Sequence, residues 1–160
     1  MDDLVKRDGV YFKKRTDVPF TGKTTGDEQG VIEDGKRIGL WVGFHENGQL
    51  RYKGTYKNGQ MDGPWVRYFD NGQFDSKETY KDGKKDGPLV SYDGNGQLYY
   101  KGTYKDGKKN GLYVTYWDDG QLLNKGNYKN DKKEGPWSNY KSNGQLLETT
   151  TFKNGVRVSD

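Results

Sequence analysis

A 24-residue spacing, repeated without insertion, constrains the fold of this chain more than any other feature. The tripeptide Asn-Gly-Gln begins at Asn47, Asn71, Asn95 and Asn143, and Asp119-Gly120-Gln121 fills the remaining place. A second glycine keeps the same step, at Gly39, Gly63, Gly87, Gly111 and Gly135. Self-similarity at a fixed period of roughly 20–50 residues is typical of repeat architectures. We therefore predict five repeats, 39–62, 63–86, 87–110, 111–134 and 135–158, after an N-terminal capping segment, 1–38, that ends in a half repeat.

Each repeat carries the pattern of a β-hairpin. Two runs of alternating apolar and polar residues, such as 64–69 and 74–80, flank the Asn-Gly pair, which favours a hairpin turn because both residues tolerate positive φ. The chain lacks alanine and has 24 glycines and 14% aromatic residues, a balance that favours strands over helices. We predict an all-β fold: an elongated single-layer antiparallel β-meander that advances about 10 Å per repeat.

The length of the Asn-Gly loop decides which aromatic positions share a face of the sheet. A two-residue loop places the Trp41 position on the same face as the Leu50 and Tyr56 positions of the second strand. A three-residue loop with a glycine bulge moves the Trp41 position to the opposite face, and the sequence is compatible with both. Glycines also recur in mid-strand, at Gly54, Gly102 and Gly126. We expect these glycines to leave room for a large ring from a neighbouring strand to lie over the backbone.

Charge and composition argue against nucleic-acid binding, cysteine chemistry and a membrane-spanning segment. The 27 Lys and Arg residues against 23 Asp and Glu residues leave a net charge of +4, which is small against the charge density of duplex DNA, so we expect no nucleic-acid partner. The absence of cysteine excludes disulfides, thiolate catalysis and Cys-based zinc sites. No apolar run approaches the roughly 20 residues that span a membrane, and no signal peptide is recognisable.

The run at 102–111, Gly-Thr-Tyr-Lys-Asp-Gly-Lys-Lys-Asn-Gly, resembles the MORN repeat (membrane occupation and recognition nexus). The pattern P-W-V-x-Y-x-x-N-G-Q-L resembles its bacterial variant, found in proteins labelled YwqK-type toxin–antitoxin antitoxins. The resemblance covers about residues 28–158 and implies a rod-like array of hairpins with a scaffold or binding role. Because bacterial relatives often carry an export signal ahead of such repeats, it implies a bacterial protein that is either cytoplasmic or exported.

The residues offer little for catalysis or metal binding. His45 is the only histidine, has no equivalent in the other repeats and is expected at the surface near a strand end. No nucleophile-elbow, zincin or P-loop motif occurs, so we predict no enzyme, cofactor or small-molecule substrate. A calcium loop over 80–88 would need an oxygen ligand where Lys84 stands, and a phosphate cradle would need a following helix.

Two surfaces are candidate binding sites. The connectors between hairpins bring paired lysines to one long edge, at Lys84, Lys85, Lys108, Lys109, Lys132 and Lys133. These lysines either keep the turns solvated and block edge-to-edge aggregation or bind an acidic partner. The second candidate is an aromatic row, Trp41, Trp65, Tyr113 and Trp137. These rings either hold the sheet together or form an exposed contact surface.

Two functions follow from these surfaces. The first is a non-catalytic scaffold for protein–protein interaction, of the antitoxin or immunity kind. The second is a module that binds anionic membrane lipids or cell-envelope glycans. The sequence leaves the partner and the oligomeric state open.

Overall fold

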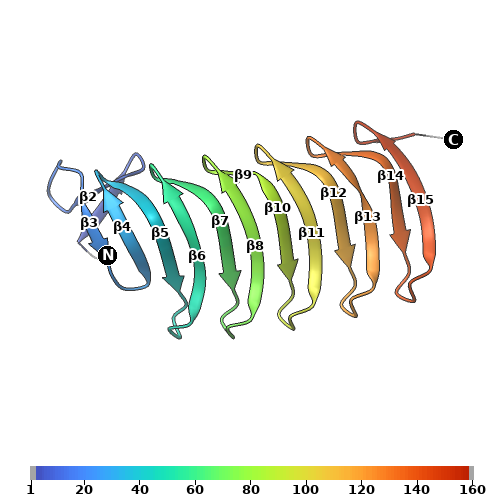
Figure 1. The fold of residues 1–160 in the computed structure, drawn as a ribbon, viewed down its shortest axis with the longest axis horizontal. Coiled ribbons are helices and arrows are strands. Elements are labelled where there is room, and N and C mark those ends of the chain that lie inside the picture. The colour runs from blue at the N-terminus through green and yellow to red at the C-terminus, as the bar shows by residue number, and fades with distance from the viewer. Residues whose placement is uncertain (1–2, 159–160) are drawn as a thin grey trace.

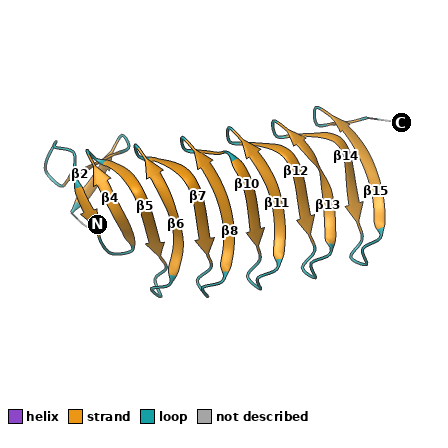
Figure 2. Ribbon diagram, in the orientation of Figure 1, coloured by secondary structure: helices purple, strands orange, loops and turns teal. Residues whose placement is uncertain are grey.

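The structure is a computed structural model that describes residues 3–158. Strands joined by loops make up the whole of this part of the chain, which contains no helix (Figure 2). The strands, in chain order, are β1 Leu4–Arg7, β2 Val10–Lys13, β3 Gly22–Thr24, β4 Glu28–Glu33, β5 Lys36–Phe44, β6 Leu50–Lys57, β7 Gln60–Tyr68, β8 Phe74–Lys81, β9 Lys84–Lys85, β10 Gly87–Tyr92, β11 Leu98–Lys105, β12 Lys108–Tyr116, β13 Leu122–Lys129, β14 Lys132–Tyr140, β15 Leu146–Lys153 and β16 Val156–Arg157.

The strands from β3 to β16 form one antiparallel sheet in which chain neighbours are also spatial neighbours. The sheet has 14 strands, and the short β9 pairs with β8 beside the main path. The hairpins lie side by side along the long axis of the molecule, and the first and last strands form its two ends (Figure 1). This arrangement confirms the predicted all-β antiparallel meander.

The first strands form a separate two-stranded sheet, β1–β2, at the N-terminal end of the ribbon. The amide of Tyr11 donates a hydrogen bond of 2.8 Å to the carbonyl of Gly35, in the turn between β4 and β5. The ring of Tyr11 also lies 5.5 Å from the guanidinium of Arg37. This small sheet therefore contacts the first connector. Residues 1 and 2 of the predicted segment 1–38 lie outside the described residues.

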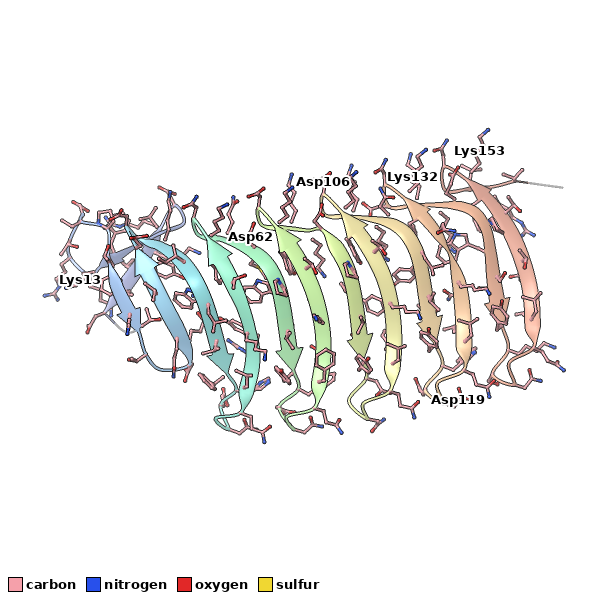
Figure 3. All side chains as sticks on the ribbon, in the orientation of Figure 1. Lys13, Asp62, Asp106, Asp119, Lys132 and Lys153 are labelled. Atoms are coloured by element: carbon pink, nitrogen blue, oxygen red, sulfur yellow. The ribbon has the colours of Figure 1, made fainter. Side chains whose placement is uncertain are left out.

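Two kinds of turn alternate along the ribbon. The Asn-Gly loops have three residues, because the amide of His45 bonds the carbonyl of Gln49 at 2.8 Å and Gly48 adopts a φ of 82°. The connectors are two-residue turns such as Asn58-Gly59, with φ values of 50° and 80°, as a type I′ hairpin turn requires. The connectors and the Asn-Gly loops lie on opposite long edges, as the labelled Lys132 and Asp119 show (Figure 3).

Besides the three-residue loop, each hairpin has a β-bulge next to that loop, and this bulge determines which residues of the two strands pair. Phe44 pairs with Leu50, but Gly43 pairs with Tyr52, so Arg51 is an extra residue on β6. This bulge reverses the shift made by the three-residue loop and places Trp41 opposite Gly54. The Trp41 position therefore shares a face with Tyr56 but not with Leu50. The two-residue alternative is therefore right about Tyr56, which shares the face of Trp41. The three-residue alternative is right about the loop length and about Leu50, which lies on the opposite face.

The ladder gives the sheet two chemically different faces, since directly paired residues share a face and neighbours along a strand alternate. We call the face that carries Trp41, Trp65, Leu89, Tyr113 and Trp137 the ring face. We call the opposite face, which carries Lys53, Lys77, Lys101 and Lys125 in mid-strand, the lysine face.

Most of the core lies on the ring face, and Val114 is the buried core residue of the lysine face. Trp65 stacks on Tyr52 at a centroid distance of 5.2 Å and meets Tyr56 edge-on at 5.3 Å. A Cβ at Gly54 would lie 2.2 Å from the Trp65 ring, so the indole lies directly against the glycine backbone. The same holds for Gly126 with Trp137 and for Gly102 with Tyr113, at 2.3 and 2.8 Å. The prediction that these glycines make room for a neighbouring ring is confirmed.

Candidate functional site

The aromatic row is part of the core. Trp41, Trp65 and Trp137 have exposed fractions of 0%, 3% and 3%, and Tyr113 is half-buried. The expectation that this row forms an exposed contact surface is wrong, because each ring is enclosed by a glycine backbone and by neighbouring rings. Each indole N–H is satisfied within the sheet; that of Trp137, for example, donates to the carbonyl of Asn127 at 3.0 Å.

The paired connector lysines divide between the two faces. The second lysine of each pair turns to the ring face: the ammonium of Lys109 lies 4.4 Å from the centre of the Tyr113 ring, and that of Lys133 lies 4.3 Å from the centre of the Trp137 ring. Lys85 makes an ion pair of 2.8 Å with Glu78. These three lysines are half-buried, so they are not part of an exposed row of lysine pairs.

The first lysine of each pair stays exposed on the lysine face. Lys84 pairs with Lys81, Lys108 with Lys105, and Lys132 with Lys129, so each of these three connectors presents two lysines on this side. The structure thus keeps Lys84, Lys108 and Lys132 as candidate binding residues and removes Lys85, Lys109 and Lys133 from that surface. The reason is the period of two along a strand, which sends adjacent side chains to opposite faces.

A further row of lysines crosses the middle of the lysine face. Along this line valine and lysine alternate from strand to strand, and we call it the valine–lysine row: Val42, Lys53, Val66, Lys77, Val90, Lys101, Val114 and Lys125. Its four lysines are all exposed, whereas its valines are half-buried or buried. Sequence reasoning missed this row, although the signal was available: the four lysines are 24 residues apart.

The lysines of this face have no carboxylate partner. Within residues 3–158, the ion pairs shorter than 4.0 Å involve four arginines and Lys85, and none involves a lysine of the lysine face. Lys101 and Lys125 lie 5.8 and 5.6 Å from the ring centres of Tyr116 and Tyr140 on the same face, and both remain exposed. Their positive charges are therefore not neutralised by a carboxylate within residues 3–158.

An exposed apolar row runs beside the valine–lysine row. Leu40 and Leu112 are 62% and 51% exposed, and prolines hold the equivalent positions in three other hairpins, at Pro64, Pro88 and Pro136. These side chains lie one pleat away from the valines, on the side of the connectors. The lysine face therefore combines exposed charge with exposed apolar surface along the length of the ribbon.

One buried polar cluster interrupts the ring face. Glu78 stands at the place of the mid-strand glycines and is 6% exposed. Its carboxylate accepts hydrogen bonds from Arg67 at 3.0 Å, Lys85 at 2.8 Å and the hydroxyl of Tyr80 at 2.7 Å. On the next strand Leu89 stands at the position that holds a tryptophan or tyrosine in the other hairpins. We interpret the cluster as structural, since all of its partners are internal.

The environment of Glu78 lowers its pKa. Burial is the largest single effect and raises the pKa of this carboxyl, but the hydrogen bonds from Lys85 and Tyr80 and the nearby positive charges of Arg67 and Lys85 together outweigh it. For the same reasons the pKa of the Tyr80 hydroxyl is raised, first by burial and then by the bond to Glu78. The carboxylate is therefore ionised at neutral pH.

A similar cluster surrounds Glu28 at the start of the array. Its carboxylate pairs with Arg37 and accepts a hydrogen bond of 2.7 Å from the Tyr52 hydroxyl. Burial raises the pKa of Glu28, and the bonds from Tyr52 and Arg37 lower it below its ordinary value. The cluster packs against Trp41, whose ring centre lies 4.1 Å from the Arg37 guanidinium.

His45 links neighbouring hairpins. Its Nε2 lies 2.9 Å from the carbonyl oxygen of Tyr68, so Nε2 carries the proton and donates to it. An open pocket of about 830 Å³ adjoins His45 and is lined mainly by polar side chains, including Asp27, Glu28 and Asp70. No group of three or more histidine or acidic side chains within residues 3–158 is arranged to hold a metal ion. No helix long and apolar enough to cross a membrane occurs in the same residues.

These features define a class: a single-layer β-hairpin repeat protein, with a row of buried rings on one face and rows of exposed lysines on the other. The profile of the MORN repeat variant family matches residues 37–58, 61–82, 85–106, 109–130 and 133–154. The chain belongs to the MORN repeat variant family. The MORN repeat is a non-catalytic module generally associated with binding or scaffold roles. No curated protein matches the chain.

Proposed function

We propose that the chain is a repeat scaffold that mediates protein–protein interaction through its lysine face. The specific form that we propose is antitoxin-like or immunity-like, in which the ribbon binds one partner protein along its length. The observation that carries this proposal is the contrast between the faces: the ring face is filled by tryptophan and tyrosine, whereas the lysine face leaves Leu40, Leu112 and rows of lysines uncovered.

Physical reasoning supports a protein partner. An exposed surface that groups apolar side chains within a polar surround is typical of protein interaction sites. The repeated hairpins hold this surface on strands rather than on mobile loops, so little ordering is required when a partner binds. The lysines at its margin favour partners with complementary negative charge and raise the rate of association.

Co-purification tests the proposal. The chain is co-expressed with the product of its neighbouring gene, and the affinity of the complex is measured by calorimetry. We expect a stable complex that the Leu40→Ser, Leu112→Ser variant weakens by about tenfold or more, since apolar groups at the centre of an interface carry most of its energy.

The matched control is the Val5→Ser, Val18→Ser variant, which removes exposed valines from the N-terminal segment rather than from the lysine face. Equal affinity of both variants and the unaltered chain would contradict the use of the lysine face. No complex with any neighbouring product would contradict the scaffold function itself.

The rows of lysines favour a second candidate function, the binding of anionic membrane lipids or cell-envelope glycans. Its test is the binding of phosphatidylserine vesicles and acidic glycans at low and raised salt. Electrostatic binding must weaken as salt rises. Binding that is absent at low salt would remove this candidate.

A further inference from the structure

We propose that the valine–lysine row binds an extended acidic segment of a partner protein, which lies along the ribbon and across its strands with a carboxylate at every third residue. This inference rests on the proposed function and specifies the chemistry of the partner. It starts from four mid-strand lysines, Lys53, Lys77, Lys101 and Lys125, which are exposed, lie in one line and have no ion-pair partner.

The solvation of turns and the protection of sheet edges do not explain why these four lysines stand in mid-strand. Lysines beside a connector, such as Lys81 and Lys84, keep the turn solvated, and a lysine on an outer strand blocks edge pairing. Lys53, Lys77 and Lys101 instead belong to strands that are paired on both sides. A mid-strand lysine on an internal strand contributes to neither purpose and only keeps the exposed face of the sheet solvated. What favours an anionic ligand is that four such lysines stand in one regular line without an ion-pair partner.

The spacing of the row matches an extended polypeptide. Successive lysines are two strands apart, which is about 9.6 Å. A polyproline II segment has three residues per turn and rises about 3.1 Å per residue, so every third side chain recurs after roughly 9.3 Å on the same side. The two repeats stay in step along the whole row, which spans about 29 Å and therefore takes about ten residues of partner.

The row has defined ends. On β4 the equivalent position is Gln29, which pairs with Val42, and on β15 it is Thr149, which pairs with Ser138. Both ends are uncharged. The array is therefore longer than its line of lysines, and the proposed segment needs four acidic residues.

The surroundings of the lysines favour a polypeptide over other polyanions. Duplex DNA carries one charge per roughly 1.7 Å, far denser than the row, and would leave most phosphates without a partner. Val66 and Val90, which are half-buried between the lysines, and the exposed Leu40 and Leu112 beside the row offer apolar contacts to the residues between the carboxylates. An acidic segment with apolar or proline residues between its carboxylates complements both features.

A synthetic peptide tests the proposal. It has about ten residues, with glutamate at every third position and proline or valine between, and its affinity for the full chain is measured by fluorescence anisotropy. The matched peptide has the same composition with its glutamates grouped at one end. We expect the spaced peptide to bind at least about fivefold more tightly, because only its carboxylates reach successive lysines together.

Two variants of the chain locate the binding. The row variant changes Lys53, Lys77, Lys101 and Lys125 to Gln; the control variant changes Lys57, Lys81, Lys105 and Lys129 to Gln and removes the same charge from the same face near the connectors. We expect the row variant to lose about tenfold or more in affinity for the spaced peptide and the control variant to lose clearly less. Circular dichroism establishes that both variants are folded.

Three results would overturn the inference: equal binding of the two peptides, equal losses in the two variants, or row-dependent binding of phosphatidylserine vesicles without binding of the spaced peptide. The experiments distinguish failure of this inference from failure of the proposed scaffold function. If the neighbouring protein binds the row variant as tightly as the unaltered chain, this inference fails and the scaffold function stands. If the spaced peptide binds through the row but no protein partner is found, the scaffold function fails.

Discussion

Glycine in the middle of a strand normally weakens a sheet, yet here it allows the largest side chains to be buried. The Trp65 indole lies where a Cβ of Gly54 would be, so the ring rests on the backbone and gains contact that no side chain at position 54 would permit. A sheet one layer thick can in this way bury a tryptophan almost completely, with 3% of Trp65 exposed.

Gly54→Ala is therefore expected to lower the free energy of unfolding by about 1–3 kcal/mol, the usual cost of forcing extra atoms into a packed core. The measurement is urea denaturation followed by tryptophan fluorescence. Gly94→Ala is the matched control, because a Cβ at Gly94 meets nothing within 4 Å and its φ is not positive. Equal stability of the two variants would show that the ring does not lie against Gly54.

The buried carboxylate of Glu78 predicts a pH dependence. Because its pKa is lower in the folded chain than in the unfolded chain, the stabilisation is complete above the unfolded pKa and is lost as pH falls through the folded pKa. Glu78→Gln should cost about 1–3 kcal/mol at pH 7, since it leaves Arg67 and Lys85 without their acceptor.

The difference in unfolding free energy between this variant and the unaltered chain should shrink as the carboxyl protonates, below about pH 4. Denaturation of both proteins across a pH series measures it. A difference that stayed constant down to low pH would mean that the ionised carboxylate does not stabilise the fold.

At the scale of the element, each hairpin could be predicted from the sequence, but its faces could not. Turn positions need residues that tolerate positive φ, so the Asn-Gly and Asp-Gly pairs and their 24-residue step indicated where the strands begin and end. The bulge at Arg51 has no comparable signature, and a shift by one residue exchanges the faces. The bulge puts the tryptophans on the same face as Tyr52 and Tyr56, whereas the divided lysine pairs follow from the period of two along a strand.

The hairpin pair around Glu78 also predicts a coupling between two positions. In other repeats a mid-strand glycine accompanies a tryptophan or tyrosine, whereas here Glu78 accompanies Leu89. Leu89→Trp alone should destabilise the chain by about 1–3 kcal/mol, because its ring and the Glu78 side chain need the same space. Combined with Glu78→Gly, the same substitution should be far less costly.

A double-mutant cycle from denaturation curves measures the coupling between Glu78→Gly and Leu89→Trp. We expect an interaction free energy of roughly 0.5–3 kcal/mol that favours the double variant. Strict additivity of the two single effects would contradict the steric relation between these positions.

The whole molecule is a ribbon whose two faces carry different side chains. The ring face buries most of the large side chains, and the lysine face leaves its mid-strand lysines, Leu40 and Leu112 exposed. The connectors serve both faces at once, because each pair of adjacent lysines sends one side chain to the rings and one to solvent. The exposed lysines of the connectors therefore lie on one face of the ribbon and do not form a basic edge made of whole lysine pairs.

Lysine acetylation under limiting reagent, with the rate at each residue measured by tandem mass spectrometry, tests this division directly. Within each connector pair, Lys84, Lys108 and Lys132 should react several-fold faster than Lys85, Lys109 and Lys133, because the latter are half-buried against rings or bonded to Glu78. Lys53, Lys77, Lys101 and Lys125 should react as fast as the first group. Equal rates within the connector pairs, or slow reaction of the mid-strand lysines, would contradict the assignment of the two faces.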